Sequence, residues 1–240
     1  MNAKIIIDYL RDVAVNNNRE WYQANKNRYD EARKELEKAI EDVIHNIAKF
    51  DSSVSHLTVK DCVYRFYRDV RFSPDKSPYK RHFGAYISAK GKKSLHGGYY
   101  IHFQPGNCFV ATGSYWLPTK ILTACRNEIM ANIDQWRKAV ENGKFVKYFG
   151  YAGENTTSEQ GDGDKMPAKG FGLSCLKKAP KDFPKDYEFI DYLRMKDYCC
   201  WHRVDDDFYG SDGWMEKTMD IMKTAKPMLD FMNDVIDDYE

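Results

Sequence analysis

The chain has 240 residues, with 37 lysines and arginines against 36 aspartates and glutamates and a formal net charge of +1. This balance excludes a bulk polycation or polyanion, and an aromatic content of 15% excludes a disordered chain, which lacks surface to bury. No run approaches the roughly 20 apolar residues of a membrane helix, and the early charges of Lys4 and Asp8 do not fit a signal peptide. We therefore expect a cytoplasmic protein without a membrane partner. The six cysteines form no C-x-x-C pair, so we interpret them as reduced thiols.

The first 50 residues are predicted to form helices. Apolar residues spaced three and four apart predict a short helix over residues 3–15 and a long amphipathic helix over 18–49. Asn17, followed by Glu20 three residues later, indicates a capping box at the start of the second helix. Both helices present an apolar stripe that must pack against a core.

The middle of the chain is predicted to form a sheet. Residues 63–72 alternate in polarity like a strand, and further strands are expected over 83–89, 99–104 and 108–115. Short turns separate the last three strands, so they should pair as an antiparallel meander.

After the meander we expect a helix over 119–142, a mobile surface loop over 151–170, and a short helix over 185–195. A strand near 198–204 and a final helix over 212–238, capped by Ser211 and kinked at Pro227, complete the prediction. Because the strands cluster between helices, the fold class is α+β, as a single domain over residues 1–240 with a mostly antiparallel sheet packed by long amphipathic helices.

Metal and nucleotide motifs give no assignment. Asp162 and Asp164 could begin a calcium loop, but the acidic residue that should close such a loop is missing. The sequence contains no P-loop, no G-x-G-x-x-G fingerprint and no nucleophile elbow. We therefore expect no metal and no cofactor, and the sequence leaves open whether the protein is an enzyme.

Charge is distributed unevenly along this neutral chain. Residues 60–93 hold ten basic and three acidic side chains, whereas residues 205–240 hold eleven acidic and three basic ones. The two regions could neutralise each other, or either could be a solvated or interacting face. We expect the acidic carboxylates to be exposed, because one face of an amphipathic helix meets water.

Arg68 falls on the apolar face of the predicted strand over 63–72, and a buried guanidinium needs a partner. Three alternatives remain open: an internal carboxylate such as Asp61 or Asp69, an anionic ligand, or a β-bulge that turns Arg68 outward. Our hypothesis is an anion-binding cleft, with two histidines nearby, made of Arg65, Arg68, Arg71, Lys76, Tyr79, Lys80, His82 and His102.

The ligand of this cleft would be a small phosphate or carboxylate compound. The alternative is a single-stranded nucleic-acid-binding or protein-interaction module without catalysis, because aromatics interleave with arginines over 64–72. We favour the small anion, since the sequence pI of about 7.6 is low for a nucleic-acid binder. The oligomeric state stays open.

One long block of the sequence resembles a known family. The residues from Asp61 to Lys80, followed by His82 to Ile87, are similar to the signature of the domain of unknown function 2461, found in bacteria and fungi. Blocks over 16–29, 98–106 and 176–181 agree with it, so the resemblance spans residues 5–203. It supports a single domain and implies no activity, because the family is uncharacterised.

Overall fold

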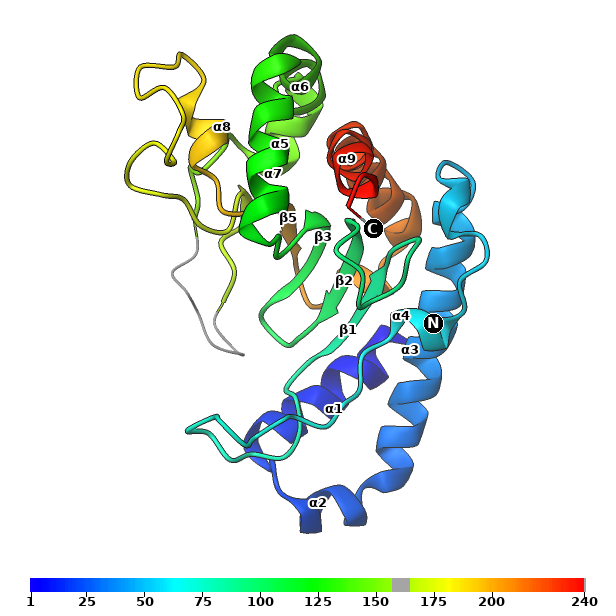
Figure 1. Cartoon of the computed structure of the whole chain (residues 1–240). Coiled ribbons are helices and arrows are strands. Elements are labelled where there is room, and N and C mark those ends of the chain that lie inside the picture. Colours follow the sequence, from blue (N-terminus) through cyan, green and yellow to red (C-terminus); the bar gives the residue numbers. More distant parts are fainter. Residues whose placement is uncertain (157–164, 240) are drawn as a thin grey trace.

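The computed structural model describes residues 1–156 and 165–239, and their strands form one five-stranded antiparallel sheet with the order β1-β2-β3-β5-β4 (Figure 1). The first three strands, β1 (Phe83–Ile87), β2 (Gly98–Phe103) and β3 (Cys108–Ser114), are the predicted meander. β5 (Tyr198–Val204) pairs with β3 and confirms the strand predicted near 198–204. The short β4 (Lys169–Phe171) pairs with the far edge of β5.

The N-terminal helices are α1 (Ala3–Val15), α2 (Arg19–Ala24) and α3 (Lys26–Ile47). The helix predicted over 18–49 is broken at Asn25, whose side-chain amide donates to the Trp21 carbonyl oxygen at 2.9 Å. Asn18, not Asn17, caps α2, because its side-chain oxygen accepts from the Trp21 N–H at 2.9 Å. A short turn, η1 (Ser52–Val54), and α4 (Val59–Cys62) lead towards β1.

Between β3 and the C-terminus lie the remaining helices, α5 (Thr119–Ala131), α6 (Ile133–Val140), α7 (Gly143–Phe149), α8 (Ile190–Arg194), η2 (Phe208–Gly210) and α9 (Trp214–Asp237). The helix predicted over 119–142 is divided at Asn132. Ser211 does not cap α9: Gly213 holds that position, and the Ser211 hydroxyl donates to the Phe208 carbonyl oxygen at 2.7 Å. Pro227 lies inside α9.

The core lies between the helices and one face of the sheet. Helix α9 packs on β3 and β5, between α3 on one side and α5 and α6 on the other (Figure 1). Alternate strand residues such as Ile101 and Val110 are fully buried, as are Met222, Met228 and Met232 of α9. The buried apolar side chains form one cluster, and the predicted α+β fold with an antiparallel sheet is confirmed.

Residues 63–72 were expected to be a strand, and this expectation is wrong. The segment makes only single bridges, Val63 to Ala85 and Tyr67 to Tyr79. After the Tyr64 N–H donates to the Gly84 carbonyl oxygen at 3.0 Å, the chain leaves β1 and pairs with its own return over 78–80. Pro74 and Pro78 supply no N–H to a ladder, which favours this loop over a continued strand. We call residues 65–80 the basic loop.

The surface loop expected over 151–170 is partly replaced by regular structure, since β4 begins at Lys169. Asp162 and Asp164, with the rest of residues 157–164, lie outside the described residues.

Candidate ligand-binding site

A pocket of about 550 Å³ lies on the face of the sheet opposite α9, which we call the outer face. Its floor is made of residues with little or no side chain, Gly98, Ala111 and Gly113. Gly98 and Gly113 are paired across β2 and β3, and Ala111 is paired with Tyr100, so these small residues are neighbours on one face. A hollow of this size suits one small organic molecule.

Aromatic side chains wall the pocket, and two glycines make room for them. The Trp201 ring lies across Gly170, where a β-carbon would come within 2.1 Å of the indole. The Trp201 indole N–H donates to the Pro167 carbonyl oxygen at 3.1 Å, which fixes the ring. In the same way, a β-carbon on Gly84 would lie 2.4 Å from the Tyr100 hydroxyl oxygen. The remaining aromatic lining side chains are Tyr64, Tyr86, Phe109, Tyr115 and Trp116.

Two lysines give one side of the pocket positive charge. The Nζ atoms of Lys80 and Lys92 lie 5.2 and 5.9 Å from the centre of the Tyr64 ring. Lys92 Nζ donates to the carbonyl oxygens of Lys60 at 2.8 Å and Val63 at 2.9 Å, and burial lowers its pKa. Among the described residues that line the pocket, none is an aspartate or a glutamate.

A row of hydrogen-bonding side chains runs along β2 at the edge of the pocket. The Tyr100 hydroxyl lies 2.8 Å from His102 Nδ1, and His102 Nε2 lies 2.8 Å from Gln104 Oε1. The His102 ring is buried, stacked on Phe109 with ring centres 4.4 Å apart. The ring of His82, which lines the pocket, lies 4.5 Å from that of His102.

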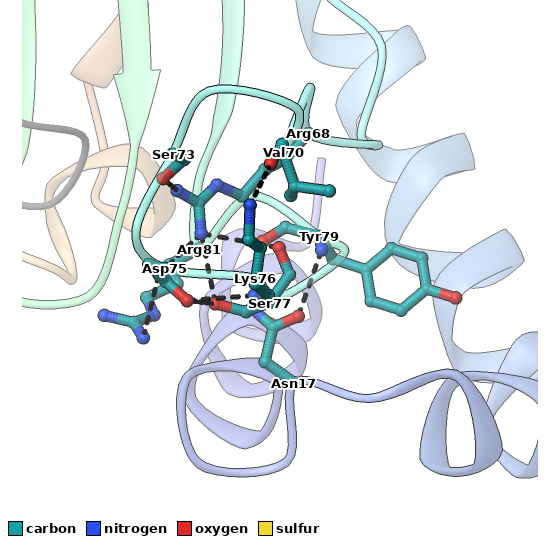
Figure 2. Close-up of polar contacts among 9 residues, drawn as sticks. All are labelled: Asn17, Arg68, Val70, Ser73, Asp75, Lys76, Ser77, Tyr79 and Arg81. Atoms are coloured by element: carbon teal, nitrogen blue, oxygen red, sulfur yellow. Dashed lines mark hydrogen bonds and ion pairs between the residues drawn. The ribbon is translucent and has the colours of Figure 1, made fainter.

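Arg68 makes contacts within the basic loop, as Figure 2 shows. The Arg68 guanidinium lies 2.5 Å from the Asp75 carboxylate and 3.0 Å from the Ser77 hydroxyl oxygen. Of the alternatives open from the sequence, an internal carboxylate is present, that of Asp75. Hydrogen bonds from Ser77, and then from Arg68, lower the pKa of Asp75. Lys76 Nζ donates to the Val70 carbonyl oxygen at 3.0 Å and closes the same loop.

Tyr79 is a core residue at the base of the loop. Its ring is buried and stacks on Tyr22 with ring centres 4.4 Å apart. The Asn17 side chain donates to the Tyr79 carbonyl oxygen at 2.9 Å and accepts from its N–H at 3.0 Å (Figure 2). This pair of bonds copies a β-bridge and ties the loop to the turn before α2, which is why Asn17 does not cap the helix.

The eight residues proposed from the sequence therefore divide into two groups. Lys80 and His82 line the pocket, and His102 contacts His82 behind it. The other five stay in the basic loop: Arg71 pairs with Asp69 at 2.7 Å, Arg65 is exposed, and Arg68, Lys76 and Tyr79 make the contacts given above.

Sequence reasoning missed the rest of the pocket, including Lys92, Tyr100 and Trp201. A pattern of small residues on one strand face, Gly98 with Ala111 and Gly113, could have indicated it.

The acidic C-terminal region pairs with several parts of the chain. Asp237 lies 2.5 Å from Lys90 of the basic region, whereas Asp206 pairs with Arg11 at 2.8 Å. Asp220 accepts from Lys144 and, at 2.7 Å, from the Tyr148 hydroxyl. The Asp220 and Asp237 side chains are exposed, as expected, but these carboxylates have partners.

Comparison with known proteins places the chain in a family. A family model described as "Conserved hypothetical protein (DUF2461)" matches residues 5–231. The chain belongs to the DUF2461 family. This confirms the resemblance seen in the sequence, and the family's description names no activity. No curated protein and no solved structure matches the chain.

Two features of this DUF2461 protein concern membranes and metal ions. None of its described helices combines the length and the apolar character needed to cross a membrane. Across residues 1–156 and 165–239, no group of three or more histidine, cysteine, aspartate or glutamate side chains is placed to hold a metal ion. The pocket on the outer face is the candidate functional site.

Proposed function

We propose that the protein binds a small anionic molecule carrying a planar ring in the pocket on the outer face of the sheet. The observation that carries the proposal is the lining itself: two lysines, a set of aromatic rings, and no carboxylate among the described lining residues. The basic residues of the sequence indicate an anionic ligand, and the aromatic lining of the pocket indicates that this ligand also carries a ring.

The anion-binding side of the pocket is the group formed by Lys80, Lys92 and Tyr64. Both ammonium groups lie over one aromatic ring, that of Tyr64, at the edge of the pocket. A phosphate or carboxylate between them would form charge-assisted hydrogen bonds. In this proposal the Arg68–Asp75 pair shapes the basic loop from which Lys80 projects, instead of touching the ligand itself.

The ring of the ligand would lie on the glycine and alanine floor. Trp201, Tyr100 and Phe109 surround that floor, and their ring faces and edges favour stacked or edge-on contact with another ring. The fixed indole of Trp201 loses little conformational entropy when a ligand arrives, which favours binding.

A thermal-shift series tests the proposal. Aryl phosphates, aromatic carboxylates and nucleoside monophosphates are compared with inorganic phosphate and acetate, which carry no ring, and with single-stranded oligonucleotides. We expect ring-bearing anions to stabilise the protein, by about 2.7 kcal/mol at a hundredfold excess over the dissociation constant. Equal shifts from ring-free anions, or shifts from oligonucleotides alone, would contradict the proposal.

Variants locate the binding. Lys80→Gln should lower the affinity for the best ligand by about tenfold to a hundredfold, which corresponds to the loss of one hydrogen bond to a charged group. Ala111→Leu should block the floor without changing charge. Lys93→Gln is the matched control, because Lys93 is exposed and is not among the lining residues. If Lys80→Gln and Ala111→Leu bind as tightly as Lys93→Gln, the ligand binds elsewhere.

A further inference from the structure

A backbone amide fixes the direction of the hydrogen-bond row along β2. The Met166 N–H, which can only donate, donates to Asn107 Oδ1 at 2.8 Å. The other end of the Asn107 amide is therefore its nitrogen, which donates to Gln104 Oε1 at 3.3 Å. The Gln104 atom at this point is consequently an acceptor.

The same reasoning fixes the proton on His102. Because Gln104 Oε1 accepts, His102 Nε2 at 2.8 Å must carry a hydrogen and donate it. In the neutral imidazole the lone pair is then on Nδ1, and the Tyr100 hydroxyl at 2.8 Å donates to it. The phenolic proton of Tyr100 thus points at a base whose tautomer is set by three further groups.

Tyr100 differs in this respect from the other tyrosines of the pocket. The Tyr86 hydroxyl lies 3.0 and 3.2 Å from the carbonyl oxygens of His96 and Gly113, which accept a hydrogen bond but do not take up a proton at neutral pH. Burial raises the pKa of Tyr64, which opposes its ionisation. The Tyr100 hydroxyl, in contrast, lies 2.8 Å from a histidine ring nitrogen, which can take up its proton.

We propose that Tyr100 is a catalytic acid–base residue, which removes a proton from a ligand group or returns one by exchanging its phenolic proton with His102. His102 and Gln104 are positioning residues that act through Tyr100. The inference rests on the proposed function, since it takes the pocket as the ligand site. It makes the protein an enzyme that moves a proton on its ligand.

The surroundings of the pair favour the charged intermediate state. When Tyr100 passes its proton to His102, a phenolate and an imidazolium are formed. The positive charges of Lys80 and Lys92 lie beyond Tyr64, whose ring centre is 6.5 Å from that of Tyr100, and they stabilise the phenolate. His82, at 4.5 Å between ring centres, is the other titratable group against His102. The Tyr209 hydroxyl donates to the backbone carbonyl oxygen of His102 at 3.4 Å.

A reactive probe built for this pocket tests the inference on the full chain. The probe is para-(fluorosulfonyl)benzoic acid, which offers a carboxylate, a ring and an electrophilic sulfur. The Tyr100 oxygen attacks sulfur, the S–O bond forms, the S–F bond breaks with loss of fluoride, and the phenolic proton passes to His102 Nδ1. Peptide mass spectrometry then identifies the modified residue.

We expect Tyr100 to be modified at least about tenfold faster than Tyr151, which is exposed and does not line the pocket, a modest share of what a positioned base supplies. Its rate should rise with pH as His102 loses its proton and then level off. In His102→Gln, which retains hydrogen-bonding capacity but no basic nitrogen, that rise should disappear and the rate should fall to that of Tyr151. Tyr239→Phe is the matched control and should leave Tyr100 labelling unchanged, because Tyr239 is exposed and is not among the lining residues.

Other outcomes overturn the inference. Modification of Tyr86, Lys80 or Lys92 in place of Tyr100 does so, as does a His102→Gln protein with unchanged rate and pH profile. If His102→Gln does not fold, Gln104→Met serves instead, because it leaves His102 in place and removes the acceptor that fixes its tautomer. Gln104→Met should slow Tyr100 labelling, and an unchanged rate would refute the relay.

Two comparisons separate this inference from the proposed function. Benzenesulfonyl fluoride lacks the carboxylate. If both probes label Tyr100 selectively and at an equal rate, the result supports the relay and contradicts the proposed anion site. Reversible aryl carboxylates that shift the melting temperature, together with an unreactive Tyr100, support the binding pocket and overturn the relay.

Discussion

Asp197 is a buried carboxylate whose ionisation should destabilise the protein. Its side chain is 3% exposed and accepts from the N–H groups of Leu173 at 3.0 Å, Ser174 at 3.2 Å and Cys199 at 3.2 Å. Burial raises the pKa of Asp197 from 3.8 to about 6, and the backbone donors only partly offset this effect. The perturbation we propose is Asp197→Asn, which keeps the shape and removes the charge.

The sign and size of the effect follow from the shift. A folded-state pKa above the unfolded value means that the fold prefers the neutral acid. The stability that this preference contributes is complete below about pH 4, is lost as the pH rises through about 6, and does not return above it. A shift of roughly two units at about 1.4 kcal/mol each makes the total about 3 kcal/mol.

Urea unfolding of both proteins across this pH range measures the effect. The free energy of unfolding of Asp197→Asn, relative to wild type, should rise by about 2.5 kcal/mol between about pH 4 and about pH 7.5. Other titrating groups cancel in this comparison, and so does the constant cost of turning an amide nitrogen towards the Ser174 N–H. A relative stability that stays flat within about 0.5 kcal/mol over the range would refute the reasoning.

Two further substitutions test packing, one beside the pocket and one in the core. Gly170→Ala should lower the free energy of unfolding by about 1–3 kcal/mol and change Trp201 fluorescence, because a β-carbon would overlap the indole. Gly143→Ala is the control and should keep or gain stability, because nothing lies within 4 Å of a β-carbon there. Equal urea midpoints for the two variants would contradict this prediction. Tyr9→Phe should raise stability by about 1 kcal/mol in the same assay, because the buried Tyr9 hydroxyl has no hydrogen-bond partner among the described residues, and a loss of stability would show that the hydroxyl is satisfied.

The helices and the meander could be predicted because the spacing of their apolar residues shows which side chains are buried. The alternation over 63–72 also showed which side chains are buried, but it could not show which element they pack against. Phe66 belongs to no strand: its ring is buried against those of Tyr9, Tyr22 and Tyr29 from the helices, with ring centres 5.2 to 6.3 Å away, and it also lies 5.2 Å from the ring of Phe83 at the start of β1. A period of two therefore predicted a strand where the structure has a loop that packs on helices.

The candidate site could be predicted only where it is local in sequence. Lys80 and His82 stand in the basic region, which composition alone singles out. Trp201 reaches the pocket because β5 pairs with β3, and Ala111 is opposite it only in that register. No pattern in the sequence fixes a pairing between strands so far apart, and the direction of a lysine such as Lys92 depends on carbonyl groups that only the fold brings together.

The strand order has a consequence for the order in which the molecule assembles. The three strands from Phe83 to Ser114 are joined by short connections, whereas β5 must close a loop that includes α5 to α8. Closing a long loop costs more chain entropy, so we expect the meander to form before β5 and α9 pack onto it. Until then its apolar face lacks α9, and its outer face lacks Trp201. The pocket and the core are thus finished together, so the proposed ligand would recognise only molecules that have folded to the end.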